Sequence, residues 1–248
     1  MALDMSFVQV ALSPPRSQPR PVNVYDVLRE GWRETRVDMT LQFFLDPSER
    51  HGLGSLVIDA LLRTFDGARV IGPSGATDAR FTAADAEGSD AWEIGTQVDF
   101  IDVYAANREL DIAIVLENKI GHVLNNPLQK YAAYARDDGF STVLVAVLAP
   151  DVRAHINPSQ QTYMSAAITY ADLSEEIKRA PALVEFLFAP EDLNQRRSLD
   201  LLQQFMEARN GDVSMSELED ESRRLDEWRR FWTSTVRLSV RSSRREAR

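Results

Sequence analysis

Three charged residues lie near the ends of two apolar segments, and their types and spacing suit chemistry on phosphate. Asp102 is flanked by two aliphatic residues, and Glu117 and Lys119 follow the apolar run Leu110–Leu116. Residues two apart on a strand share a face, so Glu117 and Lys119 should point the same way and Asn118 the opposite way. If the two segments pair as a hairpin, Asp102 comes to lie beside Glu117.

These groups together would make a site for a hard cation. The carboxylates of Asp102 and Glu117 and the carbonyl oxygen of Asn118 form an incomplete octahedral shell, which suits Mg²⁺, with Mn²⁺ as a substitute. Such a cation neutralises charge on phosphoryl oxygens and activates water, and the Lys119 ammonium adds positive charge beside them. The pattern predicts phosphodiester hydrolysis. The alternative is a surface salt bridge at the strand ends, worth at most ~1 kcal/mol.

The composition narrows the class of protein. The chain has 248 residues, of which 44% are hydrophobic, enough for a real core. It has no apolar run of the ~20 residues that a membrane helix needs, and Asp4 stands where a signal peptide would be positive, so we expect a cytoplasmic protein without membrane contact. With no Cys and three scattered His, thiolate metal sites and an HExxH pair are excluded.

The charge balance opposes one kind of nucleic-acid binding. Asp and Glu number 38 against 28 Lys and Arg, a net charge of −10, which argues against non-specific coating of nucleic acid. Net charge says little about a single cleft, however, and a cation site must itself concentrate carboxylates. The stretch 223–248 is basic and contains aromatic residues. It fits either a surface against a phosphate backbone or an ordinary solvated helix with a frayed tail.

The N-terminal part of the chain reads as an arm followed by two helices. A proline-rich stretch places residues 1–22 in an extended arm. Apolar residues at three- and four-residue spacing predict helices over 24–45, ended by Asp46-Pro47, and over 56–65. Residues 72–90 lack a period and are rich in Gly, Ala, Ser and Asp, so we expect a surface loop or insertion there.

Strands dominate the middle of the chain and helices its end. The expected order is a strand over 98–104, a turn over 105–108, a strand over 110–116, a helix over 127–136, strands over 142–148 and 166–170, and helices from Asp172 onward. This order predicts an α/β fold with a mixed central sheet flanked by helices, and with extra C-terminal helices. We expect one domain over 23–210 and a separable C-terminal helix and basic tail over 211–248.

Several motifs resemble one known family. The run LDIAIVLENKI, with IDV upstream, resembles the signature of the PD-(D/E)XK nuclease superfamily, in particular a group with an RIDI-like strand before an IENKI-like strand. The segments LQFFLDP and HGLG resemble that group's first helix terminus and following turn, and VAVLAP and ITY resemble its later strands. The similarity spans roughly residues 23–208 and implies a restriction endonuclease-like fold.

The resemblance implies a magnesium-dependent nuclease, most simply a DNA endonuclease of a defence or repair system, with DNA favoured over RNA. It makes Asp102 and Glu117 metal ligands, Lys119 the catalytic lysine, and Glu34 an acid of the first helix that approaches the site. Glu34 is equally well explained as a solvated helix carboxylate. A second copy of the chain or a regulatory protein would be a further partner. The alternative function is a catalytically silent module of this fold that binds nucleic acid or a protein.

The chain departs from the family pattern at three positions. Phe100 stands where the group has Arg. Pro127 stands where the helix usually has Gln, so Gln129 is the expected substitute, and with Lys130 and Tyr131 it forms the expected substrate-binding set. Asp99 competes with Asp102 as the metal ligand, and we favour Asp102 because its aliphatic neighbours point to the opposite face. His51 is expected to pack the HGLG turn rather than to take part in catalysis.

Overall fold

The computed structural model describes residues 23–25, 34–119, 126–150, 158–188 and 193–209. The predicted arm and basic tail, and the part of the first predicted helix over 26–33, lie outside the described residues. Among the helices that are described, none is both long and apolar enough to cross a membrane.

A five-stranded mixed sheet forms the centre of the protein. Its strands lie in the order β3 (Glu93–Val98), β4 (Ile101–Asn107), β5 (Ile112–Asn118), β6 (Thr142–Ala149) and β7 (Ala166–Thr169). The first three strands pair antiparallel, and β6 and β7 continue the sheet in parallel pairs. With helices on both faces, this is the predicted α/β fold of the restriction endonuclease type.

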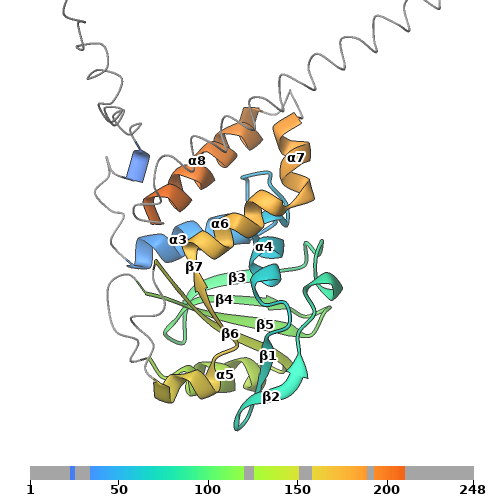
Figure 1. The fold of residues 1–248 in the computed structure, drawn as a ribbon, viewed down its shortest axis with the longest axis vertical. Helices are drawn as coiled ribbons and strands as arrows, with labels where there is room; N and C mark the ends of the chain where they lie inside the picture. Colours follow the sequence, from blue (N-terminus) through green and yellow to red (C-terminus); the bar gives the residue numbers. More distant parts are fainter. Residues whose placement is uncertain (1–22, 26–33, 120–125, 151–157, 189–192, 210–248) are drawn as a thin grey trace, which may run out of the picture.

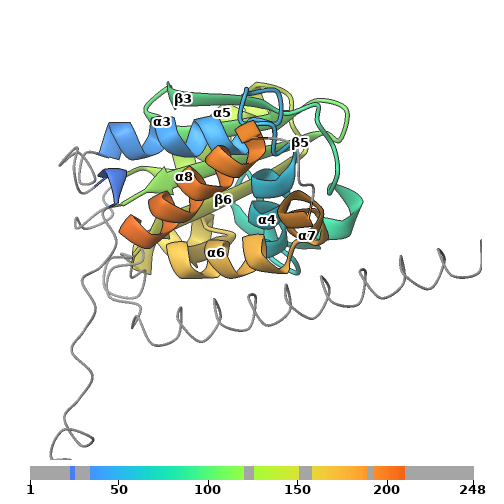
Figure 2. The same ribbon diagram turned by 90° about the horizontal axis from the view of Figure 1, so that it is seen from above.

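The helices form unequal layers (Figure 1). One face of the sheet is covered by α3 (Glu34–Leu45), α4 (Leu56–Thr64) and α6 (Tyr170–Arg179). Helix α8 (Leu193–Arg209) packs on the outside of these helices, with α7 (Pro181–Phe188) beside it, as Figure 1 and Figure 2 show. The other face is covered by α5 (Leu128–Asp137). Because both faces are covered, every residue of β5 is buried, which explains its nearly continuous apolar run.

Most of the predicted elements are present. Helix α3 ends at Leu45, directly before Asp46-Pro47, and α5 begins after Pro127. The predicted inner stripe of α5 is buried: Leu128, Tyr131, Ala132 and Ala135. Strand β6 matches the prediction closely, and the described residues after Thr169 are mainly helical, as expected.

The prediction for the first hairpin was wrong in its boundaries. The predicted strand 98–104 runs across a turn, because Val98 pairs with Ile101 and leaves Asp99 and Phe100 between the strands. The predicted turn 105–108 falls partly on β4, which continues to Asn107, and β3 was not predicted. The turn lacks the Asn-Gly type of signal that marks such hairpins in a sequence. All seven residues of β4 are buried, so alternation did not reveal its bounds.

The loop predicted over 72–90 was also wrong in part. The strands β1 (Arg69–Gly72) and β2 (Gly75–Arg80) form a small antiparallel sheet, followed by a 3-10 turn, η1 (Ala83–Asp85). Strand β2 is largely exposed, so it carries no apolar alternation. A contact with α5 fixes the position of this small sheet, because the Arg136 guanidinium donates to the carbonyl of Gly72 at 3.0 Å.

His51 packs inside the turn after α3, as expected. Its Nδ1 accepts the Leu53 N–H at 2.9 Å, so Nε2 carries the proton and donates to the Asp46 carbonyl at 2.8 Å. The imidazole also contacts the rings of Phe43 and Phe44. Burial lowers the pKa of His51, because the charged imidazolium would lose its hydration. A second proton on Nδ1 would also remove the acceptor that Leu53 uses.

We predict that His51→Ala lowers the free energy of unfolding by roughly 2 to 4 kcal/mol at pH 7, because two buried backbone groups lose their partner and a cavity is left. Urea unfolding measures the change. Since the folded-state pKa lies below the unfolded value, the wild type should also lose stability as the pH falls below that unfolded value, and the variant should lack this component. A change under ~0.5 kcal/mol, the size typical of a surface substitution, would contradict the packing role.

Candidate functional site

The β4–β5 pairing brings two carboxylates together. Val103 pairs with Leu116, so the next step of the register places Asp102 opposite Glu117, where β4 begins and β5 ends. Their neighbours Tyr104 and Val115 belong to the core beneath α5, and alternation puts both acids on that face. Each carboxyl group interacts directly with the other. The Glu117 side chain has no exposed surface, so this acid pair is a buried one.

Burial dominates the protonation of the acid pair. Removal from water raises the pKa of Glu117 to about 8, the negative charge of Asp102 adds to this, and Lys119 opposes it. Burial also raises the pKa of Asp102, against the positive charge of Lys119 and the hydrogen bonds that it accepts. The pair therefore retains a proton near neutral pH.

Lys119 lies on the same side as the acid pair. Its ammonium is 2.6 Å from Oε1 of Glu117, and its backbone N–H donates to the Leu148 carbonyl at 2.9 Å, which continues the β5–β6 pairing past the strand end. Beyond that ion pair and its contact with the Asp102 carboxyl group, Glu117 has no hydrogen-bond partner for its carboxylate oxygens among the residues that the structure describes. A carboxylate has up to four acceptor positions, so these oxygens can accept a further ligand.

Asn118 connects the acid pair to the opposite face of the sheet. Its N–H donates to Oδ2 of Asp102 at 2.9 Å. Its side chain points away from the pair, where Nδ2 donates to Oδ1 of Asp38 at 2.8 Å and Oδ1 accepts the Tyr170 hydroxyl at 2.7 Å. Burial raises the pKa of Tyr170, so this hydroxyl remains a donor. Asn118, whose backbone carbonyl is the expected metal ligand, is thus fixed on both sides. Its N–H binds Asp102 of β4, and its side chain binds Asp38 of α3 and Tyr170 of α6.

Asp38 and Gln97 belong to this network and were not predicted from the sequence. The Gln97 amide donates to Oδ2 of Asp38 at 3.2 Å and to Oδ1 of Asp102 at 3.3 Å. Asp38 is fully buried in the apolar stripe of α3, next to Val37 and one turn before Leu41. An acid inside such a stripe is a signal that could have identified it. Gln97 gave no comparable signal, because its position depends on the hairpin turn.

Two further acids, Asp99 and Glu34, were candidates for this site. Asp99 is exposed in the hairpin turn, whereas Asp102 is buried beside Glu117, so the geometry favours Asp102 of the two. Glu34 is the first residue of α3, and its side chain lies outside the described part of the chain.

The expected substrate-binding set on α5 divides in two. Gln129 and Lys130 are exposed on the helix surface. Tyr131 is buried, and its hydroxyl accepts a hydrogen bond from the Asn126 amide at 3.2 Å. Burial raises the pKa of Tyr131, and the nearby charges of Glu117 and Asp102 add to the effect. Tyr131 therefore lies near enough to the acid pair to feel its charge, while Gln129 and Lys130 face solvent.

The sequence model of the PD-(D/E)XK nuclease superfamily matches residues 22–187, about two thirds of the chain. The chain belongs to the PD-(D/E)XK nuclease superfamily. No curated protein and no solved structure was found to match it. Proteins of the PD-(D/E)XK superfamily are usually hydrolytic nucleases and generally use divalent metals, so the membership indicates nuclease chemistry on a nucleic acid.

The acid pair fits a hard divalent cation of the kind that PD-(D/E)XK proteins use. Its donors are all oxygens, and the two buried oxygens of Glu117 contact only Lys119 and Asp102 among the described residues. Within the described ranges no group of three or more His, Asp and Glu side chains is suited to a metal, so a cation held by the pair would have two carboxylate ligands from the described side chains. The backbone carbonyl of Asn118, between the two functional side chains, is the candidate for a third protein ligand.

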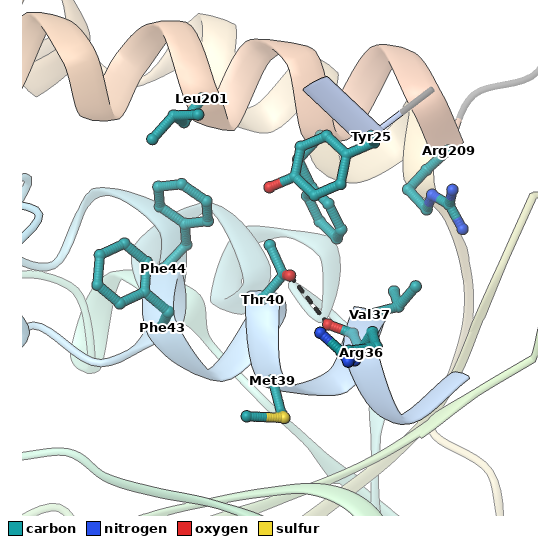
Figure 3. Close-up of a pocket in the computed structure, with 10 residues that line it drawn as sticks. Tyr25, Arg36, Val37, Met39, Thr40, Phe43, Phe44, Leu201 and Arg209 are labelled. Atoms are coloured by element: carbon teal, nitrogen blue, oxygen red, sulfur yellow. Dashed lines mark hydrogen bonds between the residues drawn. The ribbon is translucent and has the colours of Figure 1, made fainter. Parts of the chain in front are cut away.

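A cavity of about 320 Å³ lies elsewhere on this PD-(D/E)XK domain (Figure 3). It is formed between α3 and α8, with Phe43 and Phe44 toward one end and Arg36 and Arg209 toward the other. None of the candidate residues with described side chains lines it. Its apolar walls do not suit phosphate chemistry, so we place the candidate active site at the acid pair instead.

The raised pKa of Glu117 predicts a pH-dependent stability. The unfolded-state value is near 4.5 and the folded-state value about 8, so the stability that Glu117 contributes is present below pH 4.5 and is lost as the pH rises through 8. Glu117→Gln does not titrate. In EDTA, its advantage over the wild type should therefore grow by a few kcal/mol between pH 5 and pH 9, in urea unfolding. Glu175→Gln, at an exposed ion pair of α6, is the control. If the difference between Glu117→Gln and the wild type does not change with pH, the raised pKa is refuted.

Proposed function

We propose that this chain is a metal-dependent nuclease that hydrolyses phosphodiester bonds in DNA as an endonuclease, with Mg²⁺ as its cofactor and Mn²⁺ as a substitute. In this proposal Asp102 and Glu117 hold the metal together with the carbonyl of Asn118, and Lys119 is the catalytic lysine. Family membership supports the hydrolytic reaction, and the geometry of the acid pair supports the assignment of these residues.

One observation carries the proposal: a buried glutamate lies beside a buried aspartate, with an ammonium group 2.6 Å from the glutamate and no further hydrogen-bond partner for its carboxylate oxygens among the described residues. Two carboxyl groups this close repel each other when both are ionised, and burial increases the cost. An arrangement that only stabilised the fold would be expected to satisfy these oxygens. A divalent cation removes both costs, and when bound it supplies Lewis-acid charge at the phosphate.

The chain's own residues divide the remaining work. Lys119, held by its backbone bond to Leu148, places positive charge where a phosphate or an attacking water would approach Glu117. Asp102 accepts hydrogen bonds from the Asn118 N–H and the Gln97 amide, which fix its carboxylate orientation. Asp38 and Tyr170 act as positioning residues, because they hold the Asn118 side chain on the far face.

The test is cleavage of plasmid DNA, linear DNA and a structured RNA by the full chain, with Mg²⁺, Mn²⁺ or EDTA. We expect cleavage of DNA that depends on the metal. Asp102→Asn, Glu117→Gln and Lys119→Met should each reduce the rate at least ~10²-fold, because each removes a charge that acts on the transition state. Asp99→Asn, the same substitution three residues away on an exposed turn, should retain activity and serves as the matched control.

Calorimetric titration with Mg²⁺ separates the proposed metal ligands from the proposed catalytic lysine. The wild type and Lys119→Met should both take up the ion, whereas Asp102→Asn and Glu117→Gln should bind it more weakly. Activity that persists in Asp102→Asn but is lost in Asp99→Asn would transfer the ligand role to Asp99. Neither cleavage nor Mg²⁺ uptake by a folded wild type would replace the proposal with a silent binding module.

A further inference from the structure

The β3–β4 hairpin ends in an unusual turn. Val98 pairs with Ile101, which leaves the two-residue turn Asp99-Phe100, and both of its residues have left-handed backbone angles, φ 48° and 67°. Two-residue turns with positive φ at both positions strongly prefer glycine at the second. A phenylalanine there is strained, since its Cβ crowds the backbone. Gln97 adds a third left-handed residue to the same hairpin.

Packing in the fold does not explain this phenylalanine. Its side chain is 81% exposed, the highest value among the exposed large hydrophobic residues in the described part of the chain. A single exposed apolar side chain is ordinary by itself. The combination is not, because this one occupies a position where glycine or asparagine would relieve strain and where the ring contributes little to the core. Strained residues that persist without a packing reason concentrate at functional sites.

The turn lies at the edge of the candidate site. Phe100 is two residues before Asp102, so their Cα atoms are no more than ~7.6 Å apart. The Gln97 amide, on the other strand of the same hairpin, donates directly to the Asp102 carboxylate. Asp99 makes the turn acidic, so this hairpin tip offers an aromatic face and no cation to an approaching nucleic acid.

The geometry points to Phe100 as a base-stacking residue that binds an unstacked nucleobase next to the phosphodiester to be cut. Stacking on an aromatic ring needs no positive charge and tolerates any base, which suits an acidic, exposed tip. The unstacked base comes from one of two sources, a single-stranded segment of the substrate or a duplex step that the ring opens as a wedge. The inference rests on the proposed nuclease function for the identity of the ligand.

Binding is measured separately from cutting. The probes are a single-stranded oligonucleotide, a gapped duplex and the matching intact duplex, each with one 2-aminopurine, which is unpaired in the first two and paired in the third. All are titrated with the full chain in EDTA. Fluorescence quenching on binding reports stacking of that base. We expect Phe100→Ala to weaken binding of the probes with an unstacked base by roughly 5- to 100-fold, the range for one lost stacking contact, and to reduce the quenching of their 2-aminopurine. Phe100→Trp should restore both.

Two further variants exclude a general effect on folding. Phe100→Gly should lose binding as Phe100→Ala does, while its thermal midpoint stays equal to or above that of the wild type, because glycine accepts the left-handed angle. Leu193→Ala, at another exposed apolar residue on α8, should leave binding unchanged. Equal quenching in Phe100→Ala and the wild type overturns the inference, as does a loss that Leu193→Ala shares.

The outcomes for the two proposals are distinguishable. A Phe100-dependent loss on gapped and single-stranded probes alone assigns the base to a single strand, and a loss on the intact duplex as well assigns it to a wedged step. If the wild type cuts no substrate with any metal but binds the probes in a Phe100-dependent way, the nuclease proposal fails and the stacking site stands. If the wild type binds none of the probes, the stacking site fails.

Discussion

The pairing of β4 with β5 is the constraint on which the rest of the site depends. It places Asp102 opposite Glu117 at the end of two strands that are buried on both faces. Two acids in that position are costly to ionise, because they lose hydration and repel each other. Lys119 offsets part of this cost through its ion pair, yet the pKa of Glu117 remains raised. Near neutral pH the acid pair therefore keeps a proton, and in the proposed function a divalent cation would take the place of that proton.

The two-residue period of a strand separates chemistry from support at the end of β5. Glu117 and Lys119 lie on the face of α5, whereas Asn118 lies between them and points to the face of α3 and α6. There Asp38 and Tyr170 bind the Asn118 amide, and its backbone N–H binds Asp102. The end of β5 therefore carries the proposed catalytic side chains on one side and the hydrogen bonds that anchor Asn118 on the other. This explains why a polar network is buried within an otherwise apolar layer of helices.

The β3–β4 hairpin connects the acid pair to the exterior. Gln97 reaches both Asp38 and Asp102 from a left-handed backbone position, so the orientation of the Asp102 carboxylate depends on how the hairpin turns. The same turn exposes Phe100, in the place where the group that this chain resembles has arginine. In the inferred stacking role, this aromatic ring would contact a base, which a tip without positive charge can do. The acidic composition of the chain is compatible with such contacts, because stacking does not require positive charge.

The sequence by itself determined the apolar strand that leads to Glu117, the helices after Pro127 and before Asp46, and the two candidate acids, because periodicity and residue type are local properties. It did not determine the bounds of β4, the small sheet of β1 and β2, or the roles of Asp38 and Gln97. These depend on contacts between segments far apart in the chain: Asp38 meets Asn118 across 80 positions, and Gln97 reaches Asp38 across 59. Local patterns record the preference of a residue for a strand or a helix, whereas only the packed sheet decides which polar side chains become partners once water is excluded.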